Sequence, residues 1–146
     1  VEAVERAGVK AKELGAKRVI PLSVSAPFHC SLMKPAEVRL EPELRGLVVR
    51  DPSVPVVANV DATPKQTGKE SVEALIRQVS LPVLWEASVR TLVNKGVSTF
   101  LEVGPGRVLN GLIKKTDRSV RVLNVEDLDS LGTIEAAWES LSNHSE

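Results

Sequence analysis

The sequence is poor in the residues that build disulfide frameworks, zinc sites and base-stacking surfaces. One cysteine among 146 residues excludes an internal disulfide and fits a reducing compartment such as the cytoplasm. Two histidines and one cysteine are too few for the usual zinc ligand sets, so we expect no metal site. Aromatic residues make up 3%, with no tyrosine, which disfavours a stacking surface for single-stranded nucleic acid.

Charge and hydropathy exclude further classes of protein. Lys and Arg number 19, as do Asp and Glu, so the net charge is zero and a broad nucleic-acid or membrane footprint is not expected. No apolar run approaches the roughly 20 residues of a membrane-spanning helix. The 42% hydrophobic and 26% charged residues are typical of a soluble globular domain, or of part of one.

The two ends of the chain differ in character. The chain starts at Val1, not Met, inside an apolar pattern of helical spacing that runs from Val4 to Leu14 and stops at Gly15. No capping residue precedes this pattern, so we expect a truncated N-terminus. The last residues are polar and are expected to form a mobile tail.

Between the ends, short strand patterns alternate with helical ones. Strands are predicted at 17–24, 54–60, 99–103 and 120–125, and helices at 32–44, 67–79, 85–93, 108–113 and 134–141. Pro42 should kink or split the first of these helices. Thr67-x-x-Glu70 is a capping box that marks the start of the second. This alternation predicts an α/β fold with a largely parallel sheet.

His29 is the first candidate for chemistry. It follows a predicted strand and precedes a helix, and ligands of open α/β sheets gather at the carboxyl ends of strands. Imidazole moves protons near neutral pH, so a general base is one reading, and a structural histidine bonded to backbone is the other. The neighbouring Cys30 should point elsewhere and is better read as a packing residue.

The remaining motifs supply neither a nucleophile nor a phosphate site. No Gly-x-Ser-x-Gly occurs in the chain. Gly104-Pro105-Gly106 lacks the spacing of the glycine-rich phosphate loops and predicts a tight strand-to-helix turn. The residue chemistry alone therefore gives a candidate base within an α/β domain.

Four stretches in order carry a family resemblance. Residues 16–36 (AKRVIPLSVSAPFHCSLMKPA), 54–61 (VPVVANVD), 76–85 (IRQVSLPVLW) and 100–109 (FLEVGPGRVL) resemble the histidine-bearing part of malonyl-CoA:acyl-carrier-protein transacylases. The resemblance spans most of Ala3 to Leu131. Several motifs in order are more specific than any single one.

The resemblance implies a division of the chain. Residues 1–23 would end a ferredoxin-like small subdomain, and 24–142 would form the C-terminal part of a large, hydrolase-like α/β acyltransferase subdomain with a parallel sheet, followed by a polar tail at 143–146. The family's Gly-His-Ser-x-Gly elbow and its malonyl-binding arginine have no counterpart here. The missing N-terminal half of the same enzyme is therefore an expected partner, and the chain alone is expected to be inactive and prone to self-association.

The resemblance also implies a reaction in fatty-acid biosynthesis. Malonyl would pass from coenzyme A to acyl carrier protein through a seryl ester, with no cofactor or metal beyond these substrates. His29 matches the family base, and Gln78 matches the residue whose backbone carbonyl fixes the imidazole tautomer. Asn59 would support the site by hydrogen bonding.

Specificity and docking follow from the same match. Phe28 stands where related acyltransferases select the extender unit, and its ring would favour malonyl over methylmalonyl. Lys17 and Arg18 are expected to help dock the acidic carrier protein, although a solvated strand end explains them equally. Two alternatives stay open: an acyltransferase-domain fragment of a polyketide or fatty-acid synthase, and a non-catalytic carrier-protein-binding module.

Overall fold

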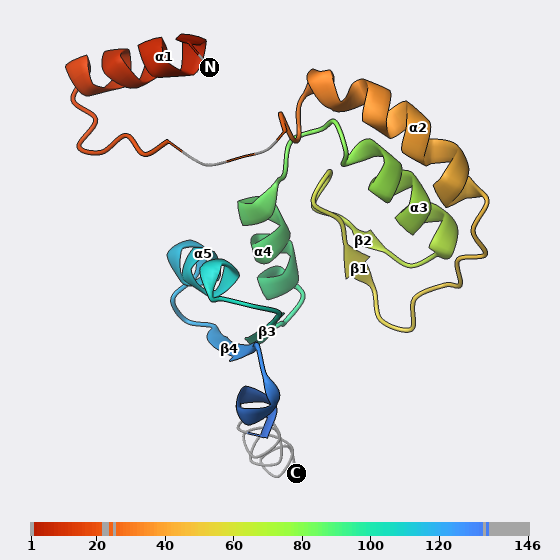
Figure 1. Ribbon diagram of the computed structural model, residues 1–146. Helices are drawn as coiled ribbons and strands as arrows, with labels where there is room; N and C mark the ends of the chain where they lie inside the picture. Colours follow the sequence, from red (N-terminus) through yellow and green to blue (C-terminus); the bar gives the residue numbers. More distant parts are fainter. Residues whose placement is uncertain (1, 22–23, 25, 133, 135–146) are drawn as a thin grey trace.

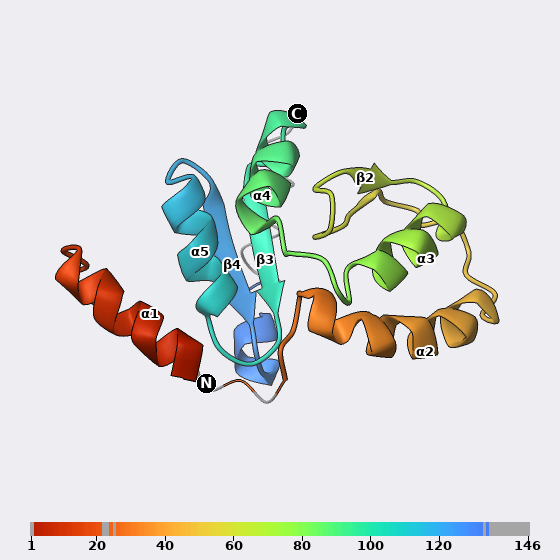
Figure 2. The same ribbon diagram turned by 90° about the horizontal axis from the view of Figure 1, so that it is seen from above.

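The computed structural model describes residues 2–21, 24, 26–132 and 134, and two groups of elements follow the first helix (Figure 1). The elements are α1 (Glu2–Glu13), η1 (Ser31–Met33), α2 (Lys34–Arg45), β1 (Val56–Val57), β2 (Pro64–Lys65), α3 (Gly68–Arg77), α4 (Trp85–Asn94), β3 (Thr99–Val103), α5 (Val108–Thr116) and β4 (Arg121–Val125). We call residues 31–80 the α2–α3 lobe and residues 84–125 the α4–α5 lobe. Figure 2 shows them on opposite sides of the segment that leads into α4.

The α4–α5 lobe is built on a β-α-β unit. Strands β3 and β4 run parallel, in a register from Thr99 opposite Arg121 to Val103 opposite Val125, and α5 connects them. This arrangement confirms the predicted α/β class with parallel strands. The apolar core of the lobe comprises the buried Val89, Ile113 and Val120 with the partly buried Trp85, Val93, Phe100 and Val122.

The α2–α3 lobe pairs two helices with a short antiparallel hairpin. Val56 and Val57 of β1 pair with Lys65 and Pro64 of β2. The buried apolar cluster here is small and consists of Ala58, Val60 and Ala74. The predicted capping box at the start of α3 is confirmed, since the Thr67 hydroxyl accepts from the Glu70 N–H and the Glu70 carboxylate accepts from the Thr67 N–H, both at 3.1 Å.

Pro42 does not split α2. The helix continues through it from Lys34 to Arg45, and the Pro42 carbonyl accepts from the Gly46 N–H at 3.0 Å at the helix end. Proline has no backbone N–H, so the carbonyl of Val38 lacks its usual hydrogen bond within the helix. Val38 is exposed, so water can satisfy that carbonyl, and packing against α3 stabilises the rest of the helix.

Two strand predictions need correction. The described residues of the predicted strand 17–24, which are 17–21 and 24, form no strand. A strand needs a neighbour to pair its backbone groups, and the two strand pairings of the described chain do not include this segment. The predicted strand 54–60 shrinks to Val56–Val57, because the chain turns back into β2, a hairpin that sequence reasoning missed. Apart from Ile134, the predicted helix 134–141 lies outside the described residues.

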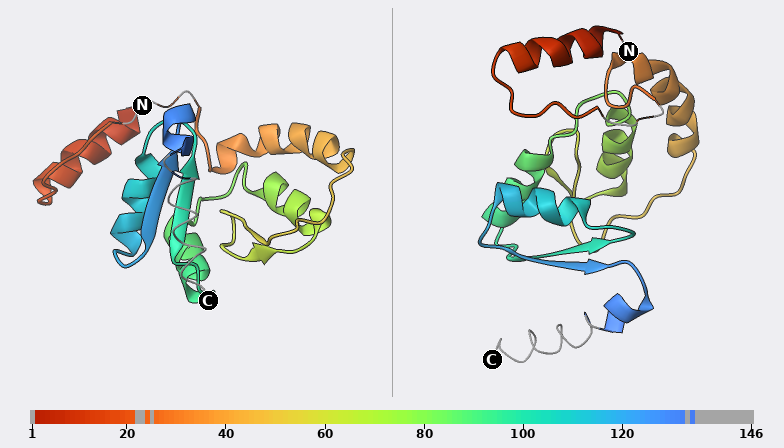
Figure 3. Two further views of the ribbon diagram at one scale, coloured as in Figure 1. Left: turned by 90° about the horizontal axis from the view of Figure 1, so that it is seen from below. Right: turned by 60° about the vertical axis from the view of Figure 1, so that its left-hand side comes forward.

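Helix α1 forms as predicted but buries none of its residues. Its apolar residues Val4 and Val9 are exposed, as is Leu14 just beyond it. Figures 1 and 2 and the left view of Figure 3 show α1 set apart from the α2–α3 lobe, whereas the N-terminal end of α1 overlaps the start of α2 in the right view of Figure 3. The described helices include none with the length and apolar character needed to cross a membrane.

Candidate functional site

His29 sits in the loop between the segment after α1 and the short helix η1. Its backbone φ is +60°, in the left-handed region that residues other than glycine rarely adopt. The side chain is exposed, so packing contributes little to its placement. Such backbone strain persists only where other contacts hold the residue in place.

One hydrogen bond orients the imidazole. His29 Nδ1 lies 2.8 Å from the backbone carbonyl oxygen of Gln78, the C-cap residue of α3. A carbonyl oxygen can only accept, so Nδ1 carries the proton and donates it. In the neutral ring, Nε2 then keeps its lone pair, which is the tautomer that a general base needs.

Phe28 lies beside this ring at a shallow apolar hollow. The Phe28 and His29 ring centroids are 6.3 Å apart with a tilt of 45°, and Phe28 is 58% exposed. The hollow has a volume of about 460 Å³ and is lined by Phe28, His29, Leu40, Leu44, Leu75, Gln78 and Val79. Residues from α2 and α3 therefore form one wall beside the imidazole.

The residue before Gln78 is fixed by an ionic cluster. Arg77 donates to the Asp61 carboxylate at 2.7 Å, and Lys65, of which only 8% is exposed, donates to both oxygens of the same carboxylate at 2.9 Å. Burial of Asp61 raises its pKa, but the hydrogen bonds from Lys65, Thr63 and Arg77 outweigh this and hold the pKa well below its usual value. This cluster ties the hairpin to the end of α3.

On the other side of Gln78, a buried carboxylate bonds to a buried hydroxyl. Glu37 of α2 is 5% exposed and accepts hydrogen bonds from Ser80 Oγ and from Lys34 Nζ. The bonds from Lys34 and Ser80 lower the pKa of Glu37, so it is ionised at neutral pH. Sequence reasoning missed Glu37, although its position three residues before Leu40 and seven before Leu44 puts a carboxylate on the inner face of α2.

The other predicted residues are placed differently. The Asn59 carbonyl accepts from the Leu84 N–H at 2.8 Å, which joins the hairpin to the start of α4. Support of the site by the Asn59 side chain stays a prediction. Lys17 and Arg18 are exposed in the segment after α1. The structure thus brings together His29, Gln78 and Phe28.

Cys30 directs its thiol to a backbone carbonyl. Its Sγ donates to the Pro27 carbonyl at 3.1 Å and the residue is partly buried. This geometry matches the predicted packing role. A thiol–imidazole pair would need Sγ to face a ring nitrogen.

In the glycine turn after β3, carboxylates accept hydrogen bonds from the backbone N–H groups. Glu102 accepts from the N–H groups of Leu109 and Asn110 at 3.0 and 2.8 Å, at the start of α5. Glu126 accepts from the Gly106 N–H at 3.0 Å. These carboxylates take the donors that a phosphate would use, so the segment is the strand-to-helix turn predicted above.

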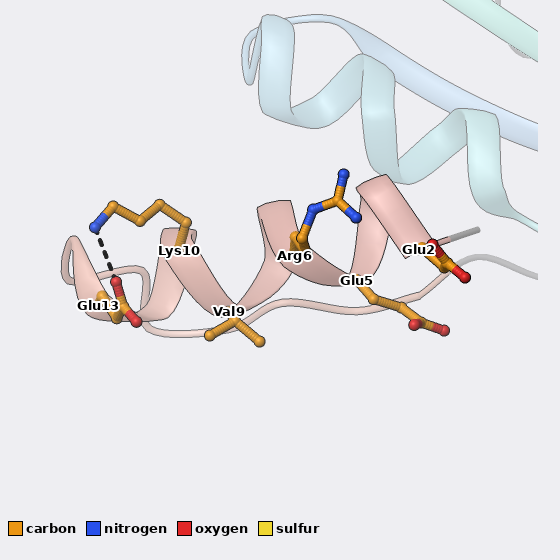
Figure 4. Close-up of a pocket in the computed structure, with 6 residues that line it drawn as sticks. All are labelled: Glu2, Glu5, Arg6, Val9, Lys10 and Glu13. Atoms are coloured by element: carbon orange, nitrogen blue, oxygen red, sulfur yellow. Dashed lines mark hydrogen bonds and ion pairs between the residues drawn. The ribbon is translucent and has the colours of Figure 1, made fainter.

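A second hollow, along α1, contains none of the predicted site residues. Its lining comes from this one helix, as Figure 4 shows, and includes the ion pair of Lys10 with Glu13 at 2.9 Å. Charged side chains on one exposed helix face form such a hollow without any ligand. Among the described residues, no group of three or more His, Cys, Asp or Glu side chains could hold a metal ion.

The known proteins that this chain is similar to in sequence and in structure are named for the same enzyme activity. No family model matches this chain. The chain is 44% identical over 143 residues to a malonyl CoA-acyl carrier protein transacylase of Bacillus subtilis (strain 168), covering 98% of this chain and 44% of that protein. The crystal structure of an acyl carrier protein S-malonyltransferase from Vibrio cholerae is similar with a TM-score of 0.82 and 44% identity, over 90% of this chain and 43% of that one.

A second solved structure shows such a protein with a partner. It is a type II PKS acyl-carrier protein in complex with its malonyl-transacylase, similar to this chain with a TM-score of 0.83 and 46% identity, over 90% of this chain and 43% of that one. The chain therefore spans less than half the length of the relatives that it matches.

Proposed function

Since this chain belongs to the malonyl CoA-acyl carrier protein transacylase family, we propose that it supplies the general base for malonyl transfer from coenzyme A to an acyl carrier protein. The observation that carries the proposal is the 2.8 Å contact of His29 Nδ1 with the Gln78 carbonyl. This contact leaves Nε2 free to take a proton, without adding a full charge beside the ring.

The nucleophile in this proposal is a serine supplied by a sequence outside this chain. His29 Nε2 takes the serine proton as the oxygen attacks the thioester carbonyl, and returns it to the sulfur of coenzyme A as the carbon–sulfur bond breaks. In the second half the base takes the proton of the carrier-protein thiol, which attacks the seryl ester, and returns it to the serine oxygen. No metal or cofactor takes part in these steps.

The test is a chimera in which this chain replaces the matching part of the Bacillus subtilis relative. We expect the chimera to move malonyl from coenzyme A to an acyl carrier protein, and His29→Ala to lower kcat by roughly 10²-fold or more. Cys30→Ala is the matched control, because its thiol faces the Pro27 carbonyl. Full activity of the His29→Ala chimera would instead favour a non-catalytic carrier-protein-binding module.

Phe28 is proposed to select the acyl group. Its ring lies beside the imidazole and half of it is open to a bound substrate. In the chimera we expect Phe28→Ala to raise kcat/KM for methylmalonyl-CoA relative to malonyl-CoA by about 10-fold. An unchanged ratio would assign the selection to another residue.

Lys17 and Arg18 are proposed to attract the acidic carrier protein. Both side chains are exposed, and neither forms an ion pair with another described residue, so their charges are available to a partner. Reversing both charges should raise KM for the carrier protein several-fold, more at low salt, and leave KM for malonyl-CoA unchanged. A location in the cytoplasm and the division of the chain at residue 24 stay predictions.

A further inference from the structure

Glu37 connects α2 to the turn that carries the Gln78 carbonyl. Its carboxylate accepts from Ser80 Oγ, and both residues are buried, with 5% and 7% exposed. Ser80 follows Gln78 by two residues, so this bond ends beside the carbonyl that receives His29 Nδ1. Lys34, one turn before Glu37 on α2, donates to the other carboxylate oxygen.

Two bonds thus join the same two segments. One segment runs from His29 to Glu37, and the other from Gln78 to Ser80. The side chain of His29 bonds to the second segment at one end, and that of Glu37 bonds to it at the other.

The peptide unit of the Gln78 carbonyl is also held through the Val79 N–H, which donates to the Ile76 carbonyl at 3.3 Å, a long bond at a helix end. The buried bond of Ser80 to Glu37 adds a second restraint on the rotation and drift of this carbonyl.

His29 needs such a fixed partner more than most residues. Its φ of +60° is unfavourable for a side chain with a Cβ, and its exposed ring gains little from packing. The contact with the Gln78 carbonyl therefore orients the ring, while the bond of the Phe28 N–H to the Ala26 carbonyl helps to hold the backbone of this loop. The strength of the contact with the ring depends on how firmly the Gln78 carbonyl is placed.

We infer that Glu37, acting through Ser80, is a positioning residue that holds the Gln78 carbonyl against His29 Nδ1 and so keeps Nε2 unprotonated for its role as base. The role of Nε2 as a base rests on the proposed function, whereas the placement of the Gln78 carbonyl by Glu37 and Ser80 does not. If Glu37 only stabilised the lobe, its loss would lower stability and leave the imidazole tautomer of the folded chain unchanged.

The test reads the tautomer directly by NMR. The probe is the long-range ¹H–¹⁵N correlation spectrum of the imidazoles in the ¹⁵N-labelled chain at alkaline pH, in a His144→Gln background so that His29 gives the only histidine signals. We expect the Nδ1–H form in the parent chain and a mixture with the Nε2–H form in Ser80→Ala and Glu37→Leu. Glu37→Gln keeps an oxygen acceptor for Ser80 and should retain the Nδ1–H form.

Glu43→Leu is the matched control, because it removes the same charge from the exposed part of the same helix. Retention of the pure Nδ1–H form in Ser80→Ala and in a folded Glu37→Leu would overturn the inference. If Glu37→Leu does not fold, Ser80→Ala decides alone, since it removes only a hydroxyl oxygen.

Kinetics of the chimera separate this inference from the proposed function. A positioning role predicts that Ser80→Ala lowers kcat by about tenfold with little change in KM, and that Glu43→Leu does not. Should the parent chimera transfer no malonyl while the tautomer still depends on Ser80, the proposed function fails and the positioning role stands. Unchanged kcat in Ser80→Ala, together with an unchanged tautomer, contradicts the positioning role alone.

Discussion

Different kinds of interaction stabilise the interior of the α2–α3 lobe and that of the α4–α5 lobe. The α4–α5 lobe packs a continuous apolar cluster around Val89, Ile113 and Val120. The connected apolar cluster of the α2–α3 lobe is smaller, although Val72 and Ile76 are also buried there.

The α2–α3 lobe also contains buried or partly buried charges: Glu37 bonds to Ser80, and Asp61 bonds to Lys65. The lobe that carries the Gln78 carbonyl therefore adds buried, directional polar bonds to its apolar contacts.

This difference follows from what each lobe must position. Apolar packing is non-directional and tolerates small shifts, whereas hydrogen bonds fix distance and angle. The Gln78 carbonyl lies between Arg77, bonded to Asp61, and Ser80, bonded to Glu37. Directional bonds on both sides of one carbonyl suit a site in which a ring nitrogen must meet an oxygen at hydrogen-bond distance.

The largest effect is expected from truncating the apolar core. Ile113 is 4% exposed, so Ile113→Ala should lower the free energy of unfolding by about 2–4 kcal/mol, measured by urea denaturation. Val108→Ala on the same helix is the control, because Val108 is exposed and should change stability by less than about 0.5 kcal/mol. Hydrogen exchange should rise mainly in α4, α5, β3 and β4. An equal rise in α3 would show that the two lobes unfold as one unit.

The next largest loss of stability is expected at Gly68, where α3 approaches the backbone of the segment before β1 closely. A Cβ on Gly68 would lie 2.3 Å from the Val49 carbonyl oxygen, so Gly68→Ala forces the segment before β1 away from α3 and should cost about 1–3 kcal/mol. Gly111 in α5 has nothing within 4 Å of an added Cβ, and Gly111→Ala should stabilise the chain by about 0.5–1 kcal/mol. Thermal unfolding of the two variants should thus shift in opposite directions.

Sequence patterns predicted most of the α4–α5 lobe. Local signals mark its elements: apolar spacing predicted α4 and α5, the strand at 99–103 matches β3, and Gly96 with a φ of +90° ends the region of α4. Parallel pairing followed from the alternation of strands and helices. Each of these signals lies within a few residues of the element that it predicts.

The α2–α3 lobe and the first 30 residues were less predictable, for physical reasons. The predicted strand 17–24 had the right residues, but pairing depends on a neighbour that no local pattern reveals. His29 could be singled out from its type and place. Helical spacing could also have put the Glu37 carboxylate on the inner face of α2, but not its bond to Ser80, which is 43 residues away. Family resemblance supplied Gln78, whose contribution is a backbone carbonyl that side-chain chemistry does not mark.

The ionic cluster of the α2–α3 lobe predicts a pH dependence. Since the pKa of Asp61 is lowered in the folded chain, its stabilising effect is fully present above its ordinary value of 3.8 and is lost as the pH falls below it. Asp61→Asn should therefore cost about 1–2 kcal/mol at neutral pH. The difference from the parent chain should shrink in acid. A difference that stays constant down to strongly acidic pH would contradict the assignment.

The exposed ion pair of the α4–α5 lobe should matter least. Arg90 and Glu86 lie 2.8 Å apart on α4, but their side chains are 59% and 69% exposed, so water and salt screen the attraction. Arg90→Ala should change the free energy of unfolding by about 0.5 kcal/mol or less, and added salt should remove that difference. A larger, salt-resistant loss would show that exposed ion pairs also stabilise this lobe. The contrast between the lobes would then lie in the size of their apolar clusters alone.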